Sequence, residues 1–139
     1  PMIFHERDSQ GRFLELLQAC PPPAGAAVIH CFSGTRAELA RYLDMGFYIG
    51  ITGIITLQER GEPLRRMAPL IPADRLLVET DAPYLTPHPE RRRFRRNEPA
   101  FVRSVLLKLA EVRREDPAEL SRTVFANTCR LYRIEDGNA

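Results

Sequence analysis

Several features that define well-known classes of protein are missing from these 139 residues. No apolar run approaches the about 20 residues of a membrane-spanning helix, so we expect no membrane association. No cationic stretch followed by an apolar one marks a secretory leader. The three cysteines, Cys20, Cys31 and Cys129, are odd in number and far apart, which excludes a paired disulfide framework and a Cys-x-x-Cys metal clip. We therefore expect a cytoplasmic protein.

Two further absences concern nucleotides and charge. No Gly-x-Gly-x-x-Gly or Walker-type loop follows an expected strand, which argues against a nucleotide cofactor. The net charge of +2 at pH 7 is too small to indicate a nucleic-acid partner by itself. Its distribution is more informative, because five of the six residues from Arg91 to Arg96 are arginine. With Phe94 in its middle, this run is either a solvated loop or a phosphate-tracking surface with a ring for base stacking.

The features that are present predict one α/β domain with a single core. Apolar runs alternate with helical patterns, which is typical of right-handed βαβ units and a parallel sheet. We expect four strands, at residues 2–5, 27–30, 47–52 and 76–78, and five helices, beginning near residue 9, at residue 35, near residue 62, after residue 97 and at residue 116.

Capping residues set the expected starts of the helices. Thr35 and Glu38 predict a capping box, and Asp116 is the expected cap of the last helix. Asn97 is the expected cap of the long helix before it, and Asp8 or Ser9 that of the first helix. The apolar spacing in the first helix predicts an inner face made of Phe13, Leu16, Leu17 and Cys20.

Three of the expected strands end in titratable side chains. Met2–His5 and Ala27–His30 end in an imidazole, and the strand at residues 76–78 leads into Glu79 and Asp81. Strand ends of this kind form one rim in α/β enzymes, so we expect His5, His30 and Asp81 to bind one cation. Imidazole with carboxylate suits zinc, manganese or iron, and magnesium where imidazoles are fewer. The alternative is that each histidine is a structural residue bonded to a neighbour.

The two carboxylates after the fourth strand are expected to differ in role. Asp81 stands at the strand exit and is the expected catalytic group, although a carboxylate capping the next turn is the alternative. Glu79 lies one layer deeper, where it would orient a ligand histidine or help activate water. Arg7, two residues after His5, is either a fork for phosphate oxygens or half of a surface ion pair with a neighbouring acid.

Taken in order, five motifs resemble the TatD family of metal-dependent deoxyribonucleases, within the amidohydrolase-like metal hydrolases. The motifs are His5-Glu6-Arg7-Asp8, His30-Cys31-Phe32-Ser33-Gly34, Tyr48-Ile49-Gly50-Ile51-Thr52-Gly53, Glu79-Thr80-Asp81-Ala82-Pro83-Tyr84-Leu85 and Arg96-Asn97-Glu98-Pro99.

The resemblance implies a (β/α)₈ barrel of the TIM type with one or two divalent ions, magnesium, manganese or zinc, at its rim. His5 and His30 then match metal ligands that end the fifth and sixth strands. Asp81, after the eighth strand, matches the carboxylate that binds the ion or takes a proton from water. The resemblance further implies that substrate phosphate is held by three residues, Arg7, Ser33 and Arg96.

The family's first-strand His-x-His pair and fourth-strand glutamate have no counterpart in this sequence, and a whole barrel needs about 250 residues. We therefore expect residues 1–134 to be the C-terminal half of a barrel, strands five to eight, followed by a polar tail at 135–139. The start of the chain directly in a strand pattern at Pro1 also suggests a piece of a longer protein. A half barrel exposes strand edges and one inner face, so we expect it to associate with itself or with the missing N-terminal half.

The implied function is hydrolysis of phosphodiester bonds in DNA by metal-activated water, with the isolated chain an incomplete fragment that is either inactive or active by itself. One alternative is a metal-dependent hydrolase of esters or amides, such as an aminoacyl-tRNA deacylase. Another is a non-catalytic fragment that binds nucleic acid through Arg91 to Arg96.

Overall fold

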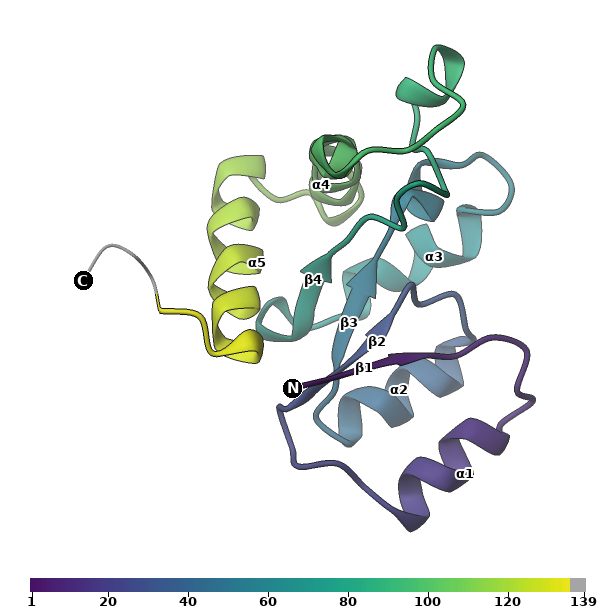
Figure 1. The fold of residues 1–139 in the computed structure, drawn as a ribbon, viewed down its shortest axis with the longest axis vertical. Helices are drawn as coiled ribbons and strands as arrows, with labels where there is room; N and C mark the ends of the chain where they lie inside the picture. The colour runs from purple at the N-terminus through teal and green to yellow at the C-terminus, as the bar shows by residue number, and fades with distance from the viewer. Residues whose placement is uncertain (136–139) are drawn as a thin grey trace.

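The computed structural model describes residues 1–135 (Figure 1). Four parallel strands form one sheet in chain order, which confirms the predicted set of strands. They are β1 (Met2–His5), β2 (Ala27–His30), β3 (Tyr48–Ile51) and β4 (Leu76–Val78). The register aligns His5 with His30, and Ile51 with Val78. Every connection steps to the adjacent strand, so the sheet has the strand order of successive staves of a barrel.

Within residues 1–135, five α-helices and five short 3₁₀ turns connect or follow these strands. The helices are α1 (Arg12–Ala19), α2 (Arg36–Asp44), α3 (Glu62–Met67), α4 (Val102–Arg113) and α5 (Pro117–Tyr132). The turns are η1 (Gly53–Thr56), η2 (Ala68–Leu70), η3 (Ala73–Arg75), η4 (Glu90–Arg92) and η5 (Pro99–Phe101). None of the helices within residues 1–135 combines the length and apolar character needed to cross a membrane.

Two predicted caps are confirmed. The Glu38 backbone N–H donates to Thr35 Oγ1 at 3.2 Å, and the Thr35 N–H donates to Glu38 Oε2 at 2.7 Å, which together form a capping box for α2. Asp116 Oδ1 accepts from the first N–H groups of α5 at 2.9 and 3.0 Å. These local signals are reliable because all the groups involved lie within one turn of chain.

The prediction for α1 is right in part, and that for α4 is wrong. Helix α1 follows Gly11, whose φ of 87° is left-handed, but Ser9 Oγ accepts the Phe13 N–H of its first turn at 3.4 Å. Helix α4 begins only at Val102, after η5, so Asn97 lies too far upstream to cap it. The prediction of the inner face of α1 was also only partly right. Leu17 is buried, but Leu16 is 53% exposed and Cys20 is exposed. Helix α1 lies at the β1 end of the sheet, and α2 is its helical neighbour there (Figure 1).

The side chains of the sheet alternate between two buried faces. Ile29, Ile49 and Leu76 belong to the main core, which the sheet shares with the helices. The opposite, inner face holds Val28, Tyr48 and Leu77, which pack with Leu131 from the end of α5. The expectation of an exposed inner face is therefore wrong for this part of the sheet, because the last helix covers it.

The two outer edges of the sheet differ. At β1, Met2 is 38% and Ile3 59% exposed, as expected for the edge of a half barrel. At β4, the side-chain amide of Asn127 donates to Ala73 O at 2.7 Å and to Leu76 O at 2.9 Å. Helix α5 thus satisfies backbone groups at the β4 end that a further strand would otherwise bind, and the β1 edge is the more open of the two.

Replacing Asn127 by alanine tests this bracing of β4. Asn127 is only 2% exposed, so its loss leaves two carbonyl groups without their donor. We expect the free energy of unfolding, measured with urea, to fall by about 1–3 kcal/mol. Ser121→Ala, at an exposed position of the same helix, is the control and should change it by less than about 0.5 kcal/mol. Equal effects of the two variants would contradict the bracing role.

Candidate active site

The predicted site residues His5, His30, Glu79 and Asp81 come together at the carboxyl ends of the strands. His5 and His30 are the paired last residues of β1 and β2. Their rings lie 5.7 Å apart between centroids, tilted by 47°. Glu79 and Asp81 follow β4, and His30 ends β2. Both carboxylates therefore reach His30 across β3, the strand that lies between β2 and β4.

His30 is clamped between these two carboxylates. Its Nδ1 lies 2.9 Å from Glu79 Oε2, and its Nε2 lies 3.2 Å from Asp81 Oδ1. Glu79 Oε2 also accepts the Cys31 N–H at 3.1 Å. The hydrogen bond from Glu79 is the largest influence on the pKa of His30, which rises to about 9 because the bonds and charges of both carboxylates outweigh burial. Because both ring nitrogens face carboxylate oxygens, this arrangement favours the protonated form of His30.

Gly50 is what allows Glu79 to reach His30. Glu79 follows β4, His30 ends β2, and Gly50 lies between them in β3. A Cβ atom on Gly50 would overlap the Glu79 carboxylate, so only glycine leaves a path across the third strand. From the sequence we assigned Gly50 no role, although a glycine inside a buried strand often marks a close approach of another group.

A pocket of about 340 Å³ adjoins the clamp. It is lined by two of the three candidate ligands, His5 and Asp81, and by Arg7, Ser33 and Arg60 among others. Arg7 and Ser33 thus lie beside the candidate metal ligands His5 and Asp81. Arg7 also pairs with Asp8 at 3.5 Å in an exposed contact, of the kind that contributes little. Arg96 is exposed and does not line this pocket.

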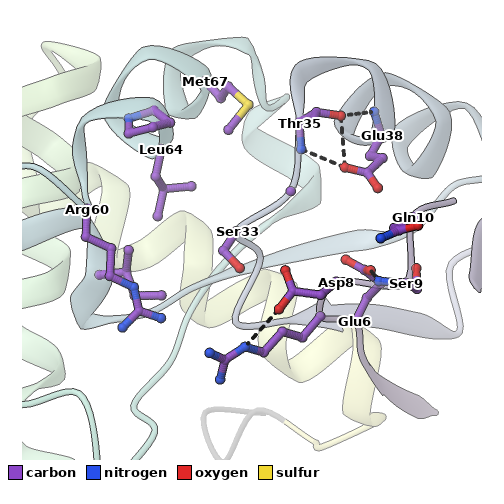
Figure 2. A pocket seen from close by; sticks show the side chains of 14 residues that line it. Glu6, Asp8, Ser9, Gln10, Ser33, Thr35, Glu38, Arg60, Leu64 and Met67 are labelled. Carbon is purple, nitrogen blue, oxygen red and sulfur yellow. Dashed lines mark hydrogen bonds and ion pairs between the residues drawn. The ribbon is translucent and has the colours of Figure 1, made fainter.

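Arg60 is the cationic residue that the sequence analysis missed. It lines the site pocket and also a neighbouring pocket of about 470 Å³. Figure 2 shows this second pocket with Arg60 on one side, Glu6 and Asp8 on the other, and Ser33 between them. Arg60 follows η1 in a loop that carries no recognisable motif, so only the folded chain brings it to the rim.

The candidate ligand side chains are of a kind that binds divalent ions, but too few of them in the described part of the chain converge on one point to hold an ion. Two imidazoles and a carboxylate are ligands that zinc and manganese accept. Within residues 1–135, however, no group of three or more histidine, cysteine, aspartate and glutamate side chains is arranged to hold an ion. His30 Nε2 instead faces Asp81 directly. The predicted metal centre is therefore present here only as part of a ligand set.

Comparison with known proteins agrees with this arrangement of the sheet. The family model for TatD related DNase matches residues 1–133, so the chain belongs to the TatD family. It is 48% identical over 136 residues to the 3'-5' ssDNA/RNA exonuclease TatD of Erwinia billingiae (strain Eb661), covering 96% of this chain and 52% of the relative. The protein of the same name from Citrobacter koseri is 46% identical over 139 residues, with the same coverage of 96% and 52%.

Solved structures give the same picture. YJJV, a TatD homolog from Escherichia coli K12, superposes with a TM-score of 0.84 at 30% identity, over 96% of this chain and 50% of that one. The hydrolase TatD family protein from Entamoeba histolytica gives 0.79 at 26% identity, over 93% and 49%. The chain thus spans about half the length of the curated relatives it matches. The fold is α/β with four parallel strands in residues 1–135, a partial TIM-barrel-like fold of the TatD type.

Gly50→Ala tests the path of Glu79 across β3. The added methyl group should push the Glu79 carboxylate away from His30, which lowers the His30 pKa because its strongest hydrogen bond is lost. Histidine proton–nitrogen correlation spectra at neutral pH should show a protonated His30 ring in the wild type and a larger neutral fraction in the variant. Ile51→Val, in the same strand but in the main core, is the control. An unchanged His30 signal in Gly50→Ala would contradict this account.

Proposed function

We propose that this chain is the C-terminal half, strands five to eight, of a metal-dependent nuclease barrel that hydrolyses phosphodiester bonds in DNA. Residues 1–134 would form the half barrel, and residues 135–139 a polar tail. The observation that carries the proposal is the position of His30 between Glu79 and Asp81 at the strand ends, next to His5 and a pocket with two arginines. The relatives named as 3'-5' ssDNA/RNA exonucleases support it, and they extend the substrate class to RNA.

Each residue of the clamp has a distinct task in this proposal. His5, His30 and Asp81 would be ligands of one divalent ion or of a pair. Glu79 accepts the hydrogen of Nδ1 and so keeps Nε2 of His30 directed at the rim, where an ion would take the place of the proton that Nε2 shares with Asp81. When bound, such an ion lowers the pKa of a coordinated water molecule and neutralises negative charge on the phosphate. Asp81 would accept the proton of the attacking water.

The cationic and hydroxyl side chains around the pocket would hold the substrate phosphate. Arg7 and Arg60 both line it, and guanidinium groups bind phosphate oxygens in pairs. Ser33 can donate its hydroxyl from the same wall. These charges would stabilise the negative charge that develops during hydrolysis. Arg96, by contrast, is exposed outside this pocket, and we do not include it in the phosphate site.

Because the ligand set is incomplete, the proposed activity depends on a second polypeptide that supplies the remaining ligands. The more open edge of the sheet, with Met2 and Ile3 exposed at β1 and Leu16 exposed on α1, is where a further strand and helix would pack. We propose that the missing N-terminal half binds there and supplies the remaining ligands, with self-association of this chain as the weaker substitute.

Complementation tests this function. The chain would be mixed with the part of the Erwinia billingiae relative that it does not match, and assayed on single-stranded DNA labelled at the 5′ end. We expect shortening from the 3′ end in the mixture with manganese or magnesium, none with the chain alone, and none with a chelator. His30→Ala and Asp81→Asn should lower the rate by about 10²-fold to 10⁴-fold.

His88→Ala, at a loop histidine that does not line the site pocket, is the control for complementation and should keep full activity. Normal turnover by His30→Ala or Asp81→Asn would refute the assignment. Release of amino acid from an aminoacyl ester without DNA cleavage would favour the deacylase alternative. Salt-sensitive DNA binding without any cleavage would favour a binding fragment, which the incomplete ligand set also allows.

Arg60→Gln tests the residue that the sequence did not reveal. A lost charged hydrogen bond to phosphate is worth about 1.5–3 kcal/mol, so kcat/KM of the complemented enzyme should fall by at least about tenfold. Arg66→Gln is the matched control, because Arg66 is exposed on α3 and pairs with Glu62. Equal activity of the two variants would remove Arg60 from the phosphate site.

A further inference from the structure

The arginine-rich segment, residues 85–96 and here called the arginine loop, is closed at its base. Asn97 is only 3% exposed, and its side-chain amide donates to Tyr84 O at 2.7 Å. Its backbone N–H donates to Pro83 O at 3.0 Å. These two bonds bring the ends of the loop together, as in a compact Ω-type loop. Asn97 therefore shapes this loop and does not cap α4.

The middle of the loop is attached to the domain at two further points. Glu90 Oε1 accepts from the Ser104 hydroxyl of α4 at 2.6 Å. The His88 N–H donates to Thr56 Oγ1 of η1 at 2.9 Å, next to the buried residues Thr86 and Pro87. A freely solvated loop would not show such contacts, so the arginine loop presents its side chains in a defined arrangement.

This arrangement creates a pocket of about 370 Å³ on the loop. Arg91, Phe94 and Arg95 line it from the loop, and Tyr84 lines it from the end that follows Asp81. The Phe94 ring packs against that of Phe101, with centroids 5.4 Å apart, yet stays 47% exposed. Within residues 1–135, neither Arg91 nor Arg95 forms an ion pair, and no acidic residue lines the pocket.

The arginine-loop pocket adjoins the active-site pocket. Tyr84 and Leu85 line both. The Tyr84 backbone N–H also donates to the Asp81 backbone carbonyl at 2.6 Å, which ties this shared wall to the main chain of the residue that carries the candidate catalytic carboxylate. A polymer bound with its reacting bond at Asp81 would therefore continue directly into the second pocket.

We infer that the arginine-loop pocket is a subsite for one unpaired nucleotide next to the cleaved phosphodiester bond. Its base stacks on Phe94, and its phosphate is held by Arg91 and Arg95. Stacking on a side chain requires a base that is free of its partner strand, so this subsite selects single-stranded nucleic acid. The inference rests on the proposed function in that it takes nucleic acid as the substrate.

Binding measured without metal tests the subsite separately from cleavage. Fluorescence anisotropy would follow a labelled single-stranded thymidine oligonucleotide in the presence of a chelator. Phe94→Ala should weaken binding by about 5-fold to 100-fold. Phe94→Leu keeps apolar packing against Phe101 and should still lose most of that affinity. The matched control is Phe125→Ala, which removes a 59% exposed ring from α5 and should bind like the wild type.

Two further readouts identify the groups on the ligand. An abasic position in the oligonucleotide should weaken binding to the wild type and leave binding to Phe94→Ala unchanged. The double variant Arg91→Gln/Arg95→Gln should reduce the slope of log Kd against log salt by about 1.4. The double control Arg36→Gln/Arg122→Gln, at exposed positions of α2 and α5, should leave that slope unchanged.

The inference is overturned if Phe94→Ala and Phe94→Leu bind as tightly as the wild type, or if duplex DNA binds as well as single strands. If the complementation assay shows cleavage while these variants bind normally, the nuclease function stands and the subsite is wrong. If the variants lose binding but no cleavage is found, the subsite stands and the nuclease function is wrong.

Discussion

The hydrogen-bonded clamp of His30 between Glu79 and Asp81 is the interaction on which the rest of the site depends. It joins the end of β2 to the segment after β4, across a strand that contributes no side chain at that point because Gly50 has none. A buried imidazole would ordinarily lose its proton, yet two carboxylates reverse that tendency. The same clamp holds two candidate ligand groups at a defined separation on a rigid sheet.

Around this clamp, the segments that follow the strands build a continuous rim. The pocket with Arg7 and Arg60 and the pocket of the arginine loop share the wall made by Tyr84 and Leu85. Asn97 closes the base of the arginine loop, and two of its arginines and the exposed ring of Phe94 line the pocket that shares this wall. Such a rim would suit the extended anionic polymer proposed as substrate, because the two adjoining pockets could hold successive parts of it.

The asymmetry of the two sheet edges explains how half a barrel can have a packed core. Helix α5 covers the inner face with Leu131 and binds the backbone near β4 through Asn127. At β1 the apolar residues Met2 and Ile3 have no such cover and are exposed. The apolar side chains are therefore covered at the β4 end of the sheet. The β1 end presents the exposed apolar surface on which, in the proposed function, a further part of the barrel would pack.

The sequence by itself determined the four strands, the capping box of α2 and the residues at the strand ends. These follow from periodicity and from groups a few residues apart. Only the tertiary structure decided that Asn97 closes a loop, that Leu16 and Cys20 are exposed, and that Arg60 reaches the rim while Arg96 lies outside the site pocket. It also showed why Gly50 is needed. Each of these outcomes depends on contacts between distant segments or on which sides of the sheet are covered, and local patterns carry no record of either.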